Sequence, residues 1–122
     1  MGDAEFAGIR EAVLELCRRG MEPVSDDVFD AVARRVYCYQ LDRDPALAAY
    51  AARRGVTADV EHWRRIPGVP TAAFKELALA TGVPDRADVV FRTSGTTRGA
   101  DRRGAHYVRD LSLYRASLLP TF

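Results

Sequence analysis

Lysine is almost missing from this sequence. Lys75 is the only one among 18 basic residues, and all the others are arginines. This imbalance is typical of a GC-rich genome, so the arginine content alone does not indicate arginine-specific chemistry. Acidic and basic residues nearly balance, giving a net charge of +1. That balance argues against nucleic acid or an acidic membrane as a partner attracted by overall charge.

Cysteines are few, and long apolar runs are absent. Cys17 and Cys38 form no CxxC or Cys/His ligand spacing, so we expect free, buried thiols rather than a disulfide or a metal site. No apolar run approaches the roughly 20 residues that a membrane-spanning helix needs. The acidic N-terminus lacks the pattern of a secretion signal. We therefore expect a cytoplasmic location and no membrane span.

The remaining composition is that of a folded chain, with 48% hydrophobic and 29% charged residues. Apolar residues recur at helical spacing through the first two thirds of the chain. The expected helices run from Phe6 to Cys17 with a stop at Gly20, from a Ser25 cap to Tyr39, from Asp44-Pro45 to Gly55, and within 57–65 around Trp63.

The character of the sequence changes at Ile66-Pro-Gly-Val-Pro70. Beyond it we predict a helix capped by Thr71 that includes Phe74, Leu77, Ala78 and Leu79, then a strand over 89–93. A polar loop over 94–104 leads to a second strand over 105–108. Asp110 then caps a last helix, whose inner face is expected to hold Leu111, Leu113, Tyr114 and Leu118.

This layout predicts an α+β fold: a mostly helical N-terminal part, then a β-hairpin around a phosphate loop, then a helix. We expect a helical segment over 1–65 and a second segment over 66–122, packed as one structural unit. A sheet of two short strands is marginal and leaves unpaired edges. We therefore expect the chain to be the N-terminal part of a longer protein. A natural small helical domain with an appended hairpin is the alternative.

The loop after the first strand carries the strongest chemical signal. Residues 93–99 hold four hydroxyls and two glycines. Glycines let backbone N–H groups converge on an anion, and hydroxyls donate to phosphate oxygens without adding bulk. Arg92, Arg98, Arg102, Arg103 and Arg109 surround this segment in the sequence. By composition alone, however, such a segment is more typical of a plain surface turn.

Two common phosphate motifs do not describe the loop. Gly99 and Gly104 have the spacing of a Walker loop, but Ala105 and His106 stand where Lys and Ser/Thr are required. No GxGxxG dinucleotide fingerprint is present either.

The order of residues from Phe91 to Gly99, Phe-x-Thr-Ser-Gly-Thr-Thr-x-Gly, resembles the phosphate loop of the adenylate-forming superfamily. It is most similar to the acyl-protein synthetases, the long-chain-fatty-acid–protein ligases of the LuxE type. Three further stretches are similar to that family: Ile66–Lys75, Gly104–Tyr107 and Asp110–Ser117.

The resemblance implies the start of an adenylate-forming domain and an ATP- and Mg²⁺-dependent reaction. A fatty or other carboxylic acid becomes acyl-AMP with release of pyrophosphate, and the acyl group moves to a thiol. Partners would include an acyl-accepting or reductase protein. The phosphate-contacting candidates that it implies are Thr93, Ser94, Gly95, Thr96, Thr97 and Gly99. Where many superfamily members have lysine, Arg98, Arg102 or Arg103 would have to supply the charge.

The resemblance identifies no catalytic residue in this chain. The family's adenine-site motifs and acyl-accepting cysteine are not found here, so we expect 122 residues alone to bind ATP weakly and to form no acyl-AMP. A phenylacetate-type aryl-CoA ligase and a non-catalytic helical interaction module remain alternatives.

His106 is interpreted as an ordinary strand histidine and Lys75 as a solvated lysine, rather than as phosphate contacts. Trp63, Tyr37, Tyr39 and Tyr50 are interpreted as packing residues, because an acyl pocket needs a larger cavity than we expect this chain to build.

Overall fold

The computed structural model describes residues 2–77, 79–81, 86–94 and 104–120. Three helices form one layer: α1 (Gly2–Arg18), α2 (Asp26–Arg43) and α3 (Pro45–Arg53). Ser25 caps α2 by accepting from the Val28 N–H, and Asp44 caps α3 by accepting from Ala46 and Leu47. Gly20 and Gly55 follow α1 and α3 with positive φ angles of 55° and 69°, which glycine adopts without steric cost. The predicted cap of α2, the predicted start of α3 and the glycine stops after α1 and α3 are confirmed, whereas α1 begins before Phe6 and α2 continues beyond Tyr39.

The segment between the helices and the hairpin contains less helix than the sequence predicted. The helices given for its described part are a 3₁₀ turn, η1 (Trp63–Arg65), and one short helix, α4 (Ala73–Glu76). The predicted Thr71 cap was wrong, because the cap position is Ala72 and makes no side-chain bond. Leu77 is already extended and about half exposed. Without buried contacts for Leu77, the apolar spacing alone does not prolong the helix. Ala78 lies outside the described residues.

The two predicted strands form an antiparallel hairpin. β1 (Val89–Arg92) pairs with β2 (Ala105–Val108), with Val89 opposite Val108 and Arg92 opposite Ala105. Helix α5 (Leu111–Leu118) follows, capped by the Asp110 carboxylate through the Ser112 N–H. The described fold is therefore α+β, rich in helix, with a small two-stranded sheet.

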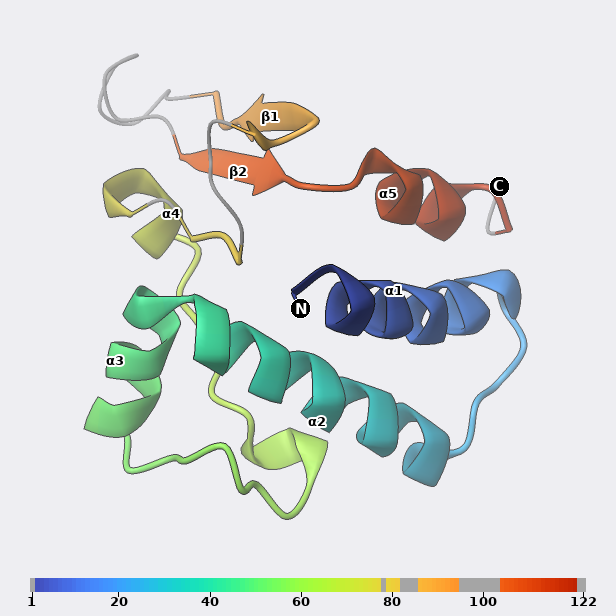
Figure 1. Ribbon diagram of the computed structural model, residues 1–122, viewed down its shortest axis with the longest axis horizontal. Coiled ribbons are helices and arrows are strands. Elements are labelled where there is room, and N and C mark those ends of the chain that lie inside the picture. The colour runs from blue at the N-terminus through green and yellow to red at the C-terminus, as the bar shows by residue number, and fades with distance from the viewer. Residues whose placement is uncertain (1, 78, 82–85, 95–103, 121–122) are drawn as a thin grey trace.

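Within the helical layer, α1 is the helix that contacts α5. Figure 1 shows the hairpin and α5 on one side of α1, with α2 and α3 on the other. The α1 and α5 helices are joined by an ion pair of 2.6 Å between Arg10 Nε and Asp110 Oδ2. At the end of β2, Arg109 donates to the Tyr39 hydroxyl at 2.9 Å and lies over the Phe6 ring. These contacts fasten the hairpin and α5 to the helical layer.

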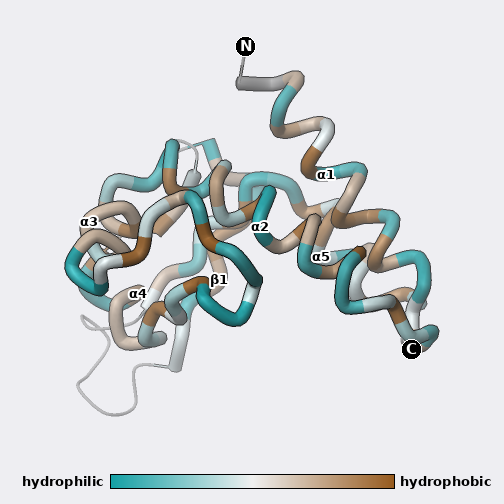
Figure 2. The backbone as a smooth tube through the Cα atoms, turned by 90° about the horizontal axis from the view of Figure 1, so that it is seen from below, coloured by the Kyte–Doolittle hydropathy of each residue, from teal (hydrophilic) through white to brown (hydrophobic). Residues whose placement is uncertain are grey.

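The described core lies mainly among the helices. Its buried apolar residues are Ile9, Leu14, Tyr37, Tyr39, Ala51, Val60 and Ala105. Brown and teal stretches alternate along α1 and α2 in Figure 2, as expected for helices with one apolar face. The predicted inner face of α5 is wrong in part, because Tyr114 and Leu118 are 46% and 39% exposed. Tyr114 packs instead on the Phe91 ring of β1, with centroids 5.2 Å apart.

Both cysteines are free, as predicted, but the prediction that both are buried was wrong. Cys17 is half-buried and Cys38 is exposed, with its Sγ 3.4 Å from the Ala58 carbonyl oxygen. Tyr37 and Tyr39, on either side of Cys38 in α2, are both buried. Residues two apart in a helix point to nearly opposite sides, so the two tyrosines are buried on different sides of α2 and the thiol between them is exposed. No helix among the described residues is long and apolar enough to cross a membrane.

A polar latch holds η1 against α2. The Trp63 indole Nε1 and the His62 Nε2 donate to the two oxygens of Asp26, at 2.9 and 2.7 Å. The Trp63 backbone N–H donates to Asp30, which also pairs with Arg34. Because His62 Nδ1 accepts from the Arg64 N–H, the neutral ring with its proton on Nε2 satisfies both of its contacts.

The chain's single tryptophan makes this latch measurable. Hydrogen bonds from Trp63 first, and then from His62, lower the pKa of Asp26 from its ordinary value. Since the folded pKa lies below the unfolded value of about 3.9, the carboxylate stabilises the latch above that pH. Its contribution is lost as the pH falls through the folded pKa. We expect a Trp63 fluorescence change below about pH 4 that disappears in Asp26→Ala. The exposed neighbour Asp27→Ala is the control, and a transition that persists in Asp26→Ala would contradict the assignment.

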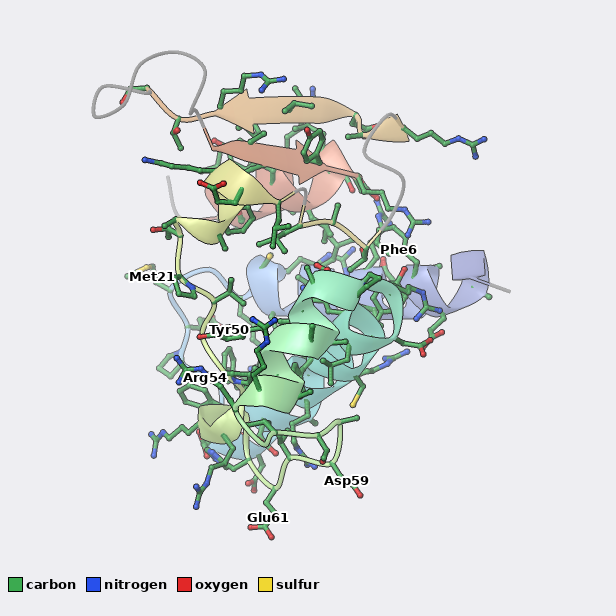
Figure 3. All side chains as sticks on the ribbon, turned by 90° about the vertical axis from the view of Figure 1, so that its left-hand side faces the viewer. Phe6, Met21, Tyr50, Arg54, Asp59 and Glu61 are labelled. Carbon is green, nitrogen blue, oxygen red and sulfur yellow. The ribbon has the colours of Figure 1, made fainter. Side chains whose placement is uncertain are left out.

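Asp110 is expected to matter more for stability than an exposed aspartate does. Replacing it with alanine removes the α5 cap and the carboxylate that pairs with Arg10, so Asp110→Ala should lower the free energy of unfolding by about 1–2 kcal/mol. Urea denaturation measures the change. Asp59→Ala serves as control, because Asp59 points outward (Figure 3) and is exposed. Equal losses in the two variants would refute the anchoring role of Asp110.

Candidate functional site

The hairpin closes just beyond its last strand pair, at Thr93 and Gly104. The Thr93 N–H donates to the Gly104 carbonyl oxygen at 2.9 Å, and the Gly104 N–H donates to Thr93 Oγ1 at 2.8 Å. We call this pair the neck. The chain leaves the neck at Ser94 and returns at Gly104, so the neck fixes both ends of the segment that carries the hydroxyls and glycines.

Most of the predicted phosphate contacts belong to that segment. Thr93 and Ser94 are described and exposed. The rest of the predicted set lies outside the described residues: Gly95, Thr96, Thr97, Arg98 and Gly99, together with Arg102 and Arg103. Their role as phosphate contacts stays a prediction.

Thr93 has a structural task at the neck. Its hydroxyl oxygen accepts the Gly104 N–H, while a hydroxyl also carries one hydrogen that can be donated. Valine has nearly the same shape but no hydroxyl oxygen, so it could not accept this hydrogen bond. Thr93 therefore holds the hairpin together, and a contact with phosphate would use only its remaining donor.

The absence of a side chain on Gly104 lets Thr93 and Lys75 lie close to it. Gly104 is buried, and a Cβ placed on it would lie 3.3 Å from Thr93 Cγ2 and 3.6 Å from Lys75 Cγ. The aliphatic stem of Lys75 thus runs beside the neck, while the residue as a whole is exposed. A flexible ammonium group on such a stem is a strong partner for phosphate. The sequence favoured a solvated lysine, which agrees with the exposure of Lys75. It did not predict that Lys75 lies beside Gly104.

An aromatic contact sets the position of Lys75. Phe74, the preceding residue in α4, stacks on His106 of β2 with ring centroids 4.1 Å apart and planes inclined by 32°. His106 is half-buried by this contact, which accords with the strand histidine that the sequence favoured. The Phe74–His106 stack fixes α4 on the hairpin, so the next side chain lies at the neck.

Arg109 does not belong to the positive surroundings of the loop, contrary to the grouping made from sequence. In the hairpin register Val108 pairs with Val89, at the end opposite to Arg92 and Ala105. Arg109 follows Val108 and contacts Tyr39 and Phe6 of the helical layer. Arg109 is close to the loop in the sequence but not in space, because strand β2 runs from the loop to the opposite end of the hairpin. Arg92 and Lys75 are the described cations near the neck.

Hydrogen-bond donors gather among the described residues at the neck. Within the described ranges, no three His, Cys, Asp or Glu side chains gather where they could hold a metal. The neck and its neighbours offer the ammonium group of Lys75 and the hydroxyls of Thr93 and Ser94, whereas the Thr93 and Gly104 N–H groups are already bonded within the neck. The ammonium group and the hydroxyls are donors, which suit phosphate oxygens.

Comparison with protein-family models found no match, and comparisons with curated proteins and with solved structures found none either.

Thr93→Val tests the neck. The substitution keeps the shape but leaves the buried Gly104 N–H without its acceptor, which should cost about 1–3 kcal/mol of unfolding free energy. It should also speed hydrogen exchange at the Gly104 amide. NMR exchange rates and urea denaturation measure both effects. Thr71→Val, at an exposed threonine outside the hairpin, is the control. Unchanged protection of Gly104 in Thr93→Val would refute the role of this hydroxyl.

Proposed function

We propose that the segment held by the neck binds the phosphates of ATP, and that the chain serves an acid–thiol ligase of the acyl-protein synthetase type. The observation that carries the proposal is the closed neck with Lys75 beside it. The neck brings the two ends of a hydroxyl- and glycine-rich segment together. The only lysine of the chain lies against the same glycine.

The chemistry of these groups supports a polyphosphate ligand. Lys75 offers a point charge with three donors, and the hydroxyls of Ser94, Thr96 and Thr97 are short donors on a glycine-rich backbone. In adenylate formation, such a site would orient the pyrophosphate and offset its charge as it leaves. Lys75 would take the place of the lysine that many members of the resembled superfamily carry at the end of the loop.

Magnesium fits the proposal as a companion of the nucleotide. Mg²⁺ commonly binds through substrate phosphates and one or two carboxylates rather than in an all-protein cage. When bound, it would neutralise phosphate charge, while Lys75 and the hydroxyls hold and orient the phosphates. The donors at the neck are compatible with this arrangement.

The acid and the thiol complete the proposed reaction. The activated acid would be a fatty or other carboxylic acid, and the acceptor a protein thiol. Cys17 and Cys38 lie in α1 and α2, and neither is part of the hairpin that carries the neck. We therefore propose that the acyl group passes to a thiol other than these two, on an acyl-accepting or reductase partner.

Titration with MgATP tests the nucleotide site. Wild-type protein should bind MgATP weakly but saturably by isothermal calorimetry. The double variant Ser94→Ala/Thr96→Ala and the variant Lys75→Ala should each weaken binding by about tenfold, because hydrogen bonds to charged groups are lost. Thr57→Ala/Thr71→Ala is the matched control, with two threonines outside the segment replaced.

Two outcomes would count against the proposal. Absence of MgATP binding by the wild-type chain would remove the nucleotide site and favour the alternative of a helical interaction module. The exposed rings of Phe91 and Tyr114 and the exposed Leu119 would then be its first candidate surface. Equal weakening in the control variant would show that hydroxyl loss acts through stability rather than through phosphate contact.

A further inference from the structure

A cavity of about 520 Å³ lies between the helical layer and the hairpin. Its walls come from both halves of the molecule and include Ile9 of α1, Leu47 of α3, Tyr107 of β2 and Leu113 of α5. Protein interiors are close-packed and seldom contain voids larger than a water molecule. A volume of this size falls within the range of small-molecule sites, about 300–1,000 Å³. From the sequence we had not expected a cavity of this size.

Three charged side chains belong to the lining of this cavity, and two of them have partners in the protein. Asp110 is paired with Arg10 at 2.6 Å, and Arg109 donates to the Tyr39 hydroxyl at 2.9 Å. The third is Asp44, the residue that precedes α3. The bonding of Asp44 therefore decides which charge the cavity offers to a ligand.

The structure uses only one of the two oxygens of the Asp44 carboxylate. Oδ1 accepts from the Ala46 and Leu47 N–H groups at 3.0 and 3.2 Å and thereby caps α3. Among the described residues, none donates a hydrogen bond to Oδ2 or forms an ion pair with it. Asp44 is nevertheless only 8% exposed. Because burial of a charge costs free energy unless the charge is paired, Oδ2 is an open, negatively charged acceptor.

The rest of the wall suits the organic part of a cation. Its aromatic members include Phe6, Tyr39 and Tyr107, and most of the others are aliphatic. The faces of aromatic rings attract cations. The protein itself uses this attraction, because the Arg109 guanidinium carbon lies 4.0 Å from the centroid of the Phe6 ring. A ligand with a hydrophobic body and one positively charged donor group matches both parts of the wall.

We propose that this cavity binds a primary ammonium ion that carries one hydrophobic group, with Asp44 Oδ2 accepting a hydrogen bond from the ammonium. The hydrophobic group lies among the aromatic and aliphatic side chains of the wall. A carboxylate is disfavoured at the same oxygen, because two like charges at hydrogen-bond distance repel each other. The proposal goes beyond the nucleotide site, since Asp44 belongs to the helical layer and not to the neck.

Three ligands of nearly the same size test which charge the cavity selects. Phenethylammonium, phenethyl alcohol and phenylpropanoate share one ring and a two-carbon chain, and they end in a cation, a neutral group and an anion. NMR titration of the wild-type chain measures each affinity. The ammonium should bind about tenfold more tightly than the alcohol, because it adds a charged hydrogen bond. No binding of the ammonium, or phenylpropanoate binding at least as tightly, would overturn the proposal.

The same titration locates the ammonium. The Ala46 and Leu47 amides donate to the Asp44 carboxylate, so their resonances should shift saturably with phenethylammonium and less with phenethyl alcohol. Shifts confined to other parts of the chain would overturn the location.

Asp44→Asn separates the charge of this residue from its capping role. Asparagine caps helices about as well as aspartate, so α3 should be kept while the negative charge is lost. Affinity for phenethylammonium should fall about tenfold, and affinity for phenethyl alcohol should stay the same. Asp42→Asn is the matched control, because it removes the same charge from a side chain that is 79% exposed.

Equal losses in Asp44→Asn and Asp42→Asn would show that overall charge, and not the cavity carboxylate, attracts the amine, and would overturn the proposal. Circular dichroism checks that both variants fold. If Asp44→Asn does not fold, the ligand series and the Ala46 and Leu47 amide shifts of the wild-type chain decide the outcome.

Discussion

The attachment of the hairpin to α1 is the interaction on which the rest of the structure depends. A two-stranded sheet is marginal in water by itself, and β1 exposes Val90 and Phe91. The Asp110 carboxylate caps α5 and pairs with Arg10 of α1, while Arg109 reaches Phe6 and Tyr39. The hydrogen bond from Ser112, with that from Arg10, lowers the pKa of Asp110 and keeps the carboxylate charged. These two adjacent residues hold the hairpin where α4 can meet it.

The candidate site follows from that attachment. Once the hairpin is fixed, the Phe74–His106 stack brings α4 against β2, and Lys75 comes to lie beside Gly104. The absence of a side chain on Gly104 permits the approach, and the Thr93 hydroxyl completes the closure.

Local signals in the sequence predicted much of the fold. Ser25 and Asp110 cap the helices for which they were assigned, and α3 begins at Pro45 as Asp44-Pro45 predicted, because such signals depend on residues only two or three positions away. The β-branched run before the loop and its return strand were also predicted. Features that depend on distant contacts were not: α4 is shorter than its apolar spacing indicated, and Cys38 faces outward. The position of Lys75 beside Gly104 joins residues 29 positions apart in the sequence, which no spacing rule reveals.

The central claim is that the neck presents an anion site. It is tested most directly by NMR titration of the chain with inorganic triphosphate, observing backbone amides and the Trp63 indole together. The account predicts saturable shifts at the Ser94 and Gly104 amides, with the indole unmoved because it lies in the latch to Asp26. Neck amides that stay in place, or shifts equally large at the indole, would contradict it.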